Sequence, residues 1–125
     1  MFKEFLIVGT GSFLGGGLRY IVSRLCTAWL ALTFPVGTFA VNIIGCFLIG
    51  ILSGLHWTQD MMNDTTKLLL ITGFCGGFTT FSSFMNENFT LVKDSNISMM
   101  AIYTIASIVM GFLCVILGNY ISKQL

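Results

Sequence analysis

Residues 73–88 read GFCGGFTTFSSFMNEN, and this stretch decides how the chain folds. It holds three glycines, four phenylalanines and four hydroxyl side chains, and its only charge is Glu87. It overlaps an uncharged run of 19 residues, Leu68 to Asn86, which is long enough to cross a bilayer as a helix. Because glycine costs about 1 kcal/mol in a helix interior, the Gly-Gly pair followed by Thr-Thr predicts a helix that breaks near its middle.

The rest of the chain is equally apolar. Of its 125 residues 55% are hydrophobic and 9% are charged, and the mean hydropathy is +0.90. A soluble domain has roughly a quarter of its residues charged, so the solvent of this chain is lipid. Two further uncharged runs, Phe34–Leu55 with 22 residues and Ile97–Ser122 with 26, also reach spanning length. The first run, Phe5–Leu18, has only 14 residues, so its helix must continue through Arg19 towards Arg24.

These runs predict an all-α membrane protein with a single domain, residues 1–125, and four transmembrane helices per subunit. The helices are expected at about 4–24, 35–56, 67–92 and 96–122, the third broken near its middle. The first segment also resembles a signal peptide with Lys3 in its charged region, but it lacks a clean small-residue cleavage site and three spans follow it. The expected surroundings are the lipid bilayer, and nothing in the chain suits nucleic acid or a nucleotide.

Charge counting gives an unusual orientation signal. Membrane orientation follows the excess of Lys and Arg in short cytoplasmic loops. The expected bundle has Lys3, Lys67 and Lys123 on one side and Arg19, Arg24 and Lys93 on the other. This balance predicts dual topology, with two inverted copies pairing as an antiparallel homodimer. The simpler alternative is that one or two of these residues are assigned to the wrong side, or that the N-terminal amine decides the orientation.

Pairs of glycines four residues apart supply faces for close helix contact. They occur at Gly11/Gly15, Gly50/Gly54 and Gly73/Gly77. Such faces serve packing within one subunit more often than contact between subunits. Four helices are too few to enclose a lumen, so a transport function would require an oligomer.

Polar residues within the spans form stripes. Thr38 and Asn42 lie four residues apart, as do Tyr103 and Ser107, and this spacing places each pair on one helical face. A Ser or Thr hydroxyl can bond to its own helix backbone, but the amide of Asn42 needs other partners and marks a functional position. The spans hold no His, no paired carboxylates and no Ser-His-Asp set, so an enzyme is not expected.

The predicted break suggests two kinds of ion contact. Carbonyl groups freed from a broken helix are ligands for a hard cation, and two breaks meeting at a dimer axis would hold one small cation. Phe81 and Phe84 are three residues apart, hence on one face, and the positive edges of their rings suit an anion to which Asn42 donates a hydrogen bond. Ordinary packing against lipid or within the core is the alternative for both rings.

Three segments carry a resemblance to a known family. GGGLRY (15–20), FPVGTFAVNIIGCFLIG (34–50) and GFCGGFTTFSSFMNEN (73–88) resemble the Fluc/CrcB family of small bacterial fluoride channels, over essentially the full length. The resemblance implies a multi-pass protein of the bacterial inner membrane that forms a dual-topology homodimer with two fluoride pathways. It also implies a central structural sodium ion, Na⁺, as the cofactor.

The resemblance further implies roles for individual residues. Phe81 and Phe84 would project into the pathways beside Asn42, the pore asparagine. The backbone carbonyls of Gly76 and Thr79 would hold the sodium ion. Arg19 would lie in an aqueous vestibule and Glu87 near one pathway end. The polar lining would consist of Thr38, Ser82, Ser83, Tyr103 and Ser107.

The expected function is therefore a fluoride-selective ion channel that exports fluoride passively and protects the cell against fluoride toxicity. The main alternative is a proton-coupled small multidrug exporter. Such an exporter needs a membrane-embedded carboxylate, whereas Glu4 is terminal and Glu87 lies towards the far end of the third span. A second alternative is a non-transporting assembly subunit, which would leave Asn42 and the hydroxyl stripes unexplained.

Overall fold

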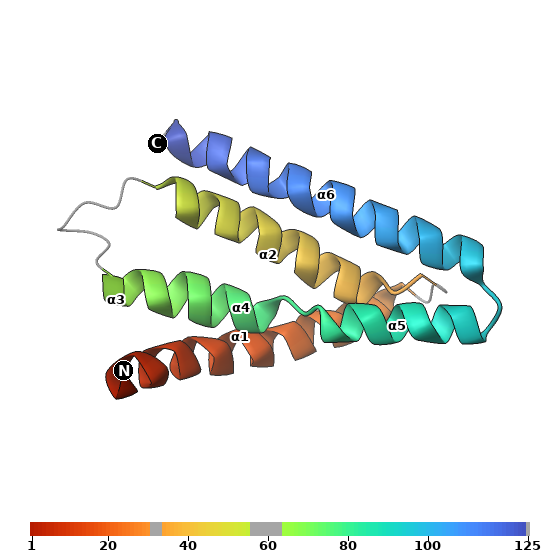
Figure 1. The fold of residues 1–125 in the computed structure, drawn as a ribbon, viewed down its shortest axis with the longest axis horizontal. Coiled ribbons are helices and arrows are strands. Elements are labelled where there is room, and N and C mark those ends of the chain that lie inside the picture. The colour runs from red at the N-terminus through yellow and green to blue at the C-terminus, as the bar shows by residue number, and fades with distance from the viewer. Residues whose placement is uncertain (31–33, 56–63, 125) are drawn as a thin grey trace.

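The computed structural model of the chain describes residues 1–30, 34–55 and 64–124, and these residues are almost entirely helical. These helices form elongated rods that run side by side (Figure 1). The first two are α1 (Phe2–Trp29) and α2 (Val36–Gly54). The third rod consists of α3 (Asp64–Lys67), the π-helix η1 (Leu68–Cys75), α4 (Gly76–Phe78) and α5 (Ser82–Lys93). The last is α6 (Ile97–Lys123).

All four rods are long and apolar enough to cross a membrane, which confirms the predicted number of spans. The expected ranges 35–56, 67–92 and 96–122 agree closely with the helices in the described part of the chain, and residue 56 lies outside that part. The largest difference is in α1, which continues to Trp29 instead of ending near residue 24. Arg24 lies within the helix, and its guanidinium Nη1 is 3.4 Å from the hydroxyl of Tyr20, one turn earlier on the same exposed face.

The third span is interrupted, as expected, but the interruption begins after the two glycines. Gly76 and Gly77 are still helical, and the backbone turns extended at Thr79, with φ −89° and ψ 160°. The helix resumes at Ser82. The break therefore falls at the Thr-Thr part of the predicted segment. Gly77 instead packs tightly on α1, because a Cβ at this position would lie 2.7 Å from the carbonyl oxygen of Ser12.

The same close packing joins α1 to the third span at four glycines. A Cβ on Gly15 would lie 2.9 Å from the amide nitrogen of Phe78, and one on Gly11 would lie 2.8 Å from that of Phe74. Gly73 returns the contact, because its Cβ would lie 2.8 Å from the carbonyl oxygen of Val8. Backbone therefore meets backbone along this interface, which only small residues permit. The predicted glycine faces serve packing within the chain.

A second glycine-mediated contact joins α2 to α6. A Cβ on Gly50 would lie 3.0 Å from the Cα of Val115, and one on Gly118 would lie 2.9 Å from the amide nitrogen of Ile51. The fold thus consists of two close pairs, α1 with the first half of the third span and α2 with α6.

An aromatic cluster packs where α5 meets α6, towards the end of the bundle opposite the N-terminus. Tyr103 has 0% of its surface exposed. Phe34 and Phe84 pack against it edge-on, with ring centroids at 5.2 Å and 4.9 Å and interplanar angles of 79° and 78°. Edge-to-face packing is the preferred geometry for aromatic rings. The cluster fixes α5 next to the start of α2.

Candidate functional site

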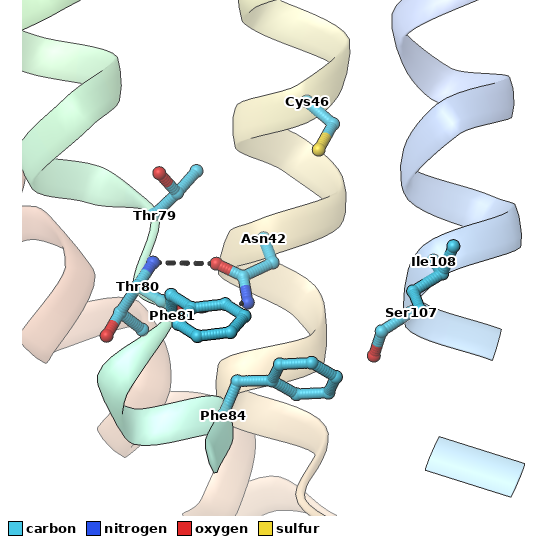
Figure 2. A pocket seen from close by; sticks show the side chains of 8 residues that line it. All are labelled: Asn42, Cys46, Thr79, Thr80, Phe81, Phe84, Ser107 and Ile108. Carbon is cyan, nitrogen blue, oxygen red and sulfur yellow. Dashed lines mark hydrogen bonds between the residues drawn. The ribbon is translucent and has the colours of Figure 1, made fainter. Parts of the chain in front are cut away.

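The interruption of the third span is held by one side chain of α2. The Nδ2 of Asn42 donates to the carbonyl oxygen of Thr80 at 3.0 Å, and the amide nitrogen of Thr80 donates to the Oδ1 of Asn42 at 2.8 Å (Figure 2). Buried backbone groups that lose their helical partners need others, and this one amide supplies both. A primary amide carries a second N–H, so Asn42 retains one donor for another acceptor.

Neighbouring residues complete the interruption. Thr79 closes the upstream helix, because its amide nitrogen and its Oγ1 each donate to the carbonyl oxygen of Cys75 at 3.0 Å. The Oγ1 of Thr80 accepts from the amide nitrogen of Ser83 at 3.2 Å and thereby caps the first turn of α5. From α1, the Nε of Arg19 donates to the carbonyl oxygen of Gly77 at 3.0 Å. The extended conformation is thus stabilised from both sides.

Several carbonyl groups at the interruption remain without a hydrogen bond in the described part of the chain. They include those of Gly76 and Thr79, because the amide of Thr80 bonds to Asn42 and that of Ser83 bonds to Thr80. Gly76 is exposed, and a Cβ added to it would meet no atom within 4 Å. These are the two residues for which the sequence analysis expected sodium-binding carbonyls.

A cavity of about 280 Å³ lies between the interruption, α2 and α6 (Figure 2). Five of the predicted site residues line it: Asn42, Thr79, Phe81, Phe84 and Ser107. The ring centroids of Phe81 and Phe84 are 6.1 Å apart with an interplanar angle of 61°. The two rings differ in surroundings, because Phe81 is 71% exposed in the single chain and Phe84 only 6%.

One hydroxyl of this cavity lacks a partner. The Oγ of Ser107 is buried, and no hydrogen bond reaches it within the described residues. A buried hydroxyl without a partner costs free energy, so an unpaired one in a cavity wall indicates that something else completes it. The cavity is therefore lined by the amide of Asn42, the unpartnered hydroxyl of Ser107 and two aromatic rings, and no carboxylate is among the described residues that line it.

Three more predicted residues meet beyond Phe84. The Oγ1 of Thr38 donates to the Oε2 of Glu87 at 2.6 Å, and the hydroxyl of Tyr103 donates to the Oε1 of Glu87 at 2.7 Å. Both oxygens of the carboxylate thus have a short bond from a hydroxyl group. Since Phe84 packs on Tyr103, this Glu87 cluster is joined to the cavity through one aromatic contact.

The remaining predicted residues lie outside the cavity wall. Ser82 is exposed and Ser83 is half-buried, both in the first turn of α5. Arg19 is half-buried and contacts the third span through Gly77. Its place in an aqueous vestibule stays a prediction, as do the pathway roles of the two serines.

Sequence reasoning missed three residues that line the cavity and one further buried polar residue, Asn88, which is not in the cavity wall. Cys46, Thr80 and Ile108 line the cavity, and Asn88 is 8% exposed with an Oδ1 that has no partner in the described part of the chain. Spacing carried a signal for two of them, because Cys46 follows Asn42 by four residues on α2 and Asn88 follows Phe84 by four on α5.

Comparisons with known proteins show the family. Residues 6–119 match the family model described as CrcB-like protein, Camphor Resistance (CrcB). The chain belongs to the CrcB family. A relative from Azobacteroides pseudotrichonymphae is 42% identical over 123 residues, which is 98% of each chain, and is named fluoride-specific ion channel FluC. Relatives with the same name come from Chlorobium luteolum, at 45% over 94% of this chain and 91% of that one, and from Flavobacterium psychrophilum, at 37% over 98% and 99%.

The family and the four spans together place this CrcB protein in a membrane. Its relatives are bacterial and are named as ion channels, and its described helices provide four segments of spanning length and composition. The chain is therefore a multi-pass bacterial membrane protein.

Proposed function

We propose that this chain forms a fluoride-selective channel that exports fluoride passively and so protects the cell against fluoride toxicity. The observation that carries the proposal is the cavity at the interruption, where the amide of Asn42, the unpartnered hydroxyl of Ser107 and the rings of Phe81 and Phe84 converge. Relatives named as fluoride-specific channels, similar over nearly the whole chain, support the choice of ion.

The lining suits a small anion. Fluoride holds its hydration shell tightly, so a selective pore must replace those waters with donors at short range. The second N–H of Asn42, the hydroxyl of Ser107 and the positive ring edges are donors of this kind. A carboxylate in the wall would repel the ion. Glu87 stands one aromatic layer away, with both oxygens bonded to the hydroxyls of Thr38 and Tyr103.

The proposed flux needs no energy source in the protein. Hydrogen fluoride enters a cell as a neutral molecule and dissociates at cytoplasmic pH, which traps the anion inside. An inside-negative potential contributes about 2.3 kcal/mol per charge per 100 mV and drives the anion out. The protein has only to supply a selective path, so we propose no enzymatic step.

We further propose that the functional unit is an antiparallel homodimer with two pores. Unwound backbone is tolerated in hydrocarbon only where protein buries it or a cavity contains it. Phe81, within the interruption, and Gly76, in the helical turn before it, are nevertheless exposed in the single chain. A second copy that covers this face would bury both. The positive charges agree with inverted copies, because Lys67 and Lys123 end helices near the N-terminal end of the bundle and Lys93 ends α5 at the other (Figure 1).

A central sodium ion fits the residues present. The carbonyl groups of Gly76 and Thr79 have no hydrogen bond in the described part of the chain, and oxygen atoms are the ligands that hard cations prefer. Two copies would together present four such oxygens. When bound, the ion would supply positive charge that attracts the carbonyl oxygens of both interruptions and so joins them.

Fluoride efflux from liposomes that contain only this protein tests the proposal, with a fluoride electrode as detector and chloride as the competing ion. We expect fast fluoride efflux and chloride efflux at the level of empty liposomes. Equal fluxes of the two halides would refute selectivity. Proton-coupled efflux of a cationic drug without fluoride flux would favour the small multidrug exporter instead.

A further inference from the structure

Two cysteines face one cavity beside the proposed pathway. A second cavity, of about 320 Å³, lies between α2 and the π-helix η1. Cys46 from α2 and Cys75 from η1 both line it, together with Asn42, Gly76 and Thr79. Cys46 also lines the first cavity, with Phe81, Phe84 and Ser107. The thiol of Cys46 thus belongs to the boundary between the two spaces.

Both side chains are free thiols held in defined positions. Neither takes part in a disulfide. Cys75 is 2% exposed. The sulfur of Cys46 lies close to α6, 3.3 Å from where a Cβ on Gly111 would stand, so a larger residue there would restrict it. Figure 2 shows the Cys46 side chain on α2, one turn beyond Asn42.

We propose that Cys46 and Cys75 form a two-sulfur site for a soft metal cation, and that a cation bound there closes the ion pathway. Thiolates are the protein ligands that select soft metals. Groups of three or more ligating His, Cys, Asp or Glu side chains do not occur among the described residues, so we propose a cation that needs only two protein ligands. Divalent mercury is such a cation.

A divalent cation balances the charge of two thiolates, which matters at a site within the membrane span. Mercuric chloride is neutral and reaches buried thiols through the bilayer. Two S–H bonds and two Hg–Cl bonds break, two Hg–S bonds form, and two protons and two chloride ions leave to water. The product, one Hg²⁺ with two thiolates, has no net charge, so the low-dielectric surroundings do not penalise it as they would a lone ion.

The blocking part of the proposal depends on the proposed function. A metal atom on the sulfur of Cys46 would stand in the wall of the cavity that contains Phe81 and Ser107. It would reduce the free volume and introduce a soft, weakly hydrated group where the ion needs hydrogen-bond donors.

Metal binding tests the site without any flux measurement. The background is the variant Cys26→Ser/Cys114→Ser, which retains only the two cysteines of interest; Cys26 lies near the end of α1 and lines neither cavity. Mercuric chloride is titrated into the purified protein, with the thiolate charge-transfer absorbance and the bound metal per chain as readouts. We expect one Hg²⁺ per chain that survives excess monothiol competitor.

Single-cysteine variants complete the test. In the same background, Cys46→Ser and Cys75→Ser should each weaken binding at least 100-fold, because one thiolate ligand is lost, while size-exclusion profiles stay unchanged. Two metal ions per chain, each removed by a monothiol, would overturn the site. So would a single-cysteine variant that binds as tightly as the background protein.

Flux then tests the block. Fluoride efflux from liposomes should fall at least tenfold when one Hg²⁺ is bound per chain, and the Cys75→Ser variant should resist, since Cys75 does not line the cavity of Phe81 and Ser107. Full flux with the metal bound would overturn the block. Absence of fluoride flux before metal is added would refute the proposed function alone, because the binding titration reads the metal site independently.

Discussion

Asn42 joins two helices through a single amide. It satisfies the amide nitrogen and the carbonyl oxygen of Thr80, which have no helical partner. The same side chain lines the cavity, so its structural and ionic roles meet at one group. Substitutions that remove only part of the amide separate the two roles.

We expect Asn42→Ala to lower both stability and fluoride flux. Each buried polar group left unpaired costs about 1–3 kcal/mol, and this change leaves two. Asn42→Asp keeps the acceptor for the amide of Thr80 but adds negative charge to the cavity, so it should retain more stability than the alanine variant and still abolish flux. Thermal unfolding in detergent and liposome efflux measure the two effects. Asn86→Ala, an exposed asparagine on α5, serves as the control and should change neither.

Substitutions of the two phenylalanines of the cavity should differ in their effect on stability and agree in their effect on fluoride flux. Phe84 packs on Tyr103 and is 6% exposed, so Phe84→Ile should cost about 1–2 kcal/mol through lost packing. Phe81→Ile, at an exposed position, should cost the single chain little. Both should cut fluoride efflux at least tenfold, because both remove a ring edge from the cavity. Normal efflux in the two variants would exclude the aromatic contact from the mechanism.

Tyr103 reports on the Glu87 cluster. Tyr103→Phe keeps the packed ring and removes one of the two hydroxyls that bond to Glu87. A hydrogen bond to a charged group is worth about 1.5–3 kcal/mol, so the unfolding temperature should fall. Tyr120→Phe, whose ring is exposed on the same helix, provides the matched control and should leave the temperature unchanged. Equal unfolding temperatures for both variants would argue against a stabilising hydrogen bond between Tyr103 and Glu87.

At the scale of whole helices, the interface between α1 and the third span depends on backbone contact. Gly11 and Gly15 on α1 face Gly73 and Gly77 on the opposite helix, and a Cβ at any of the four would lie within 3 Å of a main-chain atom. Main-chain atoms cannot turn aside as a flexible side chain does. The interface also positions the interruption, because Arg19 reaches Gly77 from it.

Gly15→Ala should therefore destabilise the protein by at least about 1–3 kcal/mol, the usual cost of overpacking. Gly17→Ala, two residues further along the same helix, has no atom within 4 Å of the added Cβ. There, alanine should be neutral or stabilise by up to about 1 kcal/mol, through helix propensity. Denaturation of both variants in the same detergent measures the two changes in the free energy of unfolding. Equal stability would show that the helices separate without cost.

At the scale of the whole molecule, the described helix ends place positive charge at both ends of the bundle. Lys67 and Lys123 end helices near the N-terminus, and Lys93 ends α5 at the opposite end. The lipid bilayer itself favours neither end of the bundle. The orientation of the protein in the membrane therefore depends on the small difference in positive charge between the two ends.

Single charge removals should therefore bias orientation in opposite directions. Lys93→Gln should direct the N-terminal end to the cytoplasm, and Lys123→Gln should direct it outward. Each variant expressed alone should show little fluoride efflux in cells, and co-expression of the two should restore it. The control is the double variant Lys93→Gln/Lys123→Gln, which is balanced again and should be active alone. Full activity of each single variant expressed alone would contradict an antiparallel dimer.

Composition and local pattern determined the solvent, the four spans and the existence of a break, because each depends on residues close together in the chain. Only the tertiary structure decided where the break falls: Asn42 stands 38 residues before Thr80 and supplies the hydrogen bonds that make an extended backbone stable at Thr79. The Glu87 cluster likewise joins Thr38 across a separation of 49 residues. Such contacts are set by the packing of one helix on another, and helix periodicity alone leaves that packing undetermined.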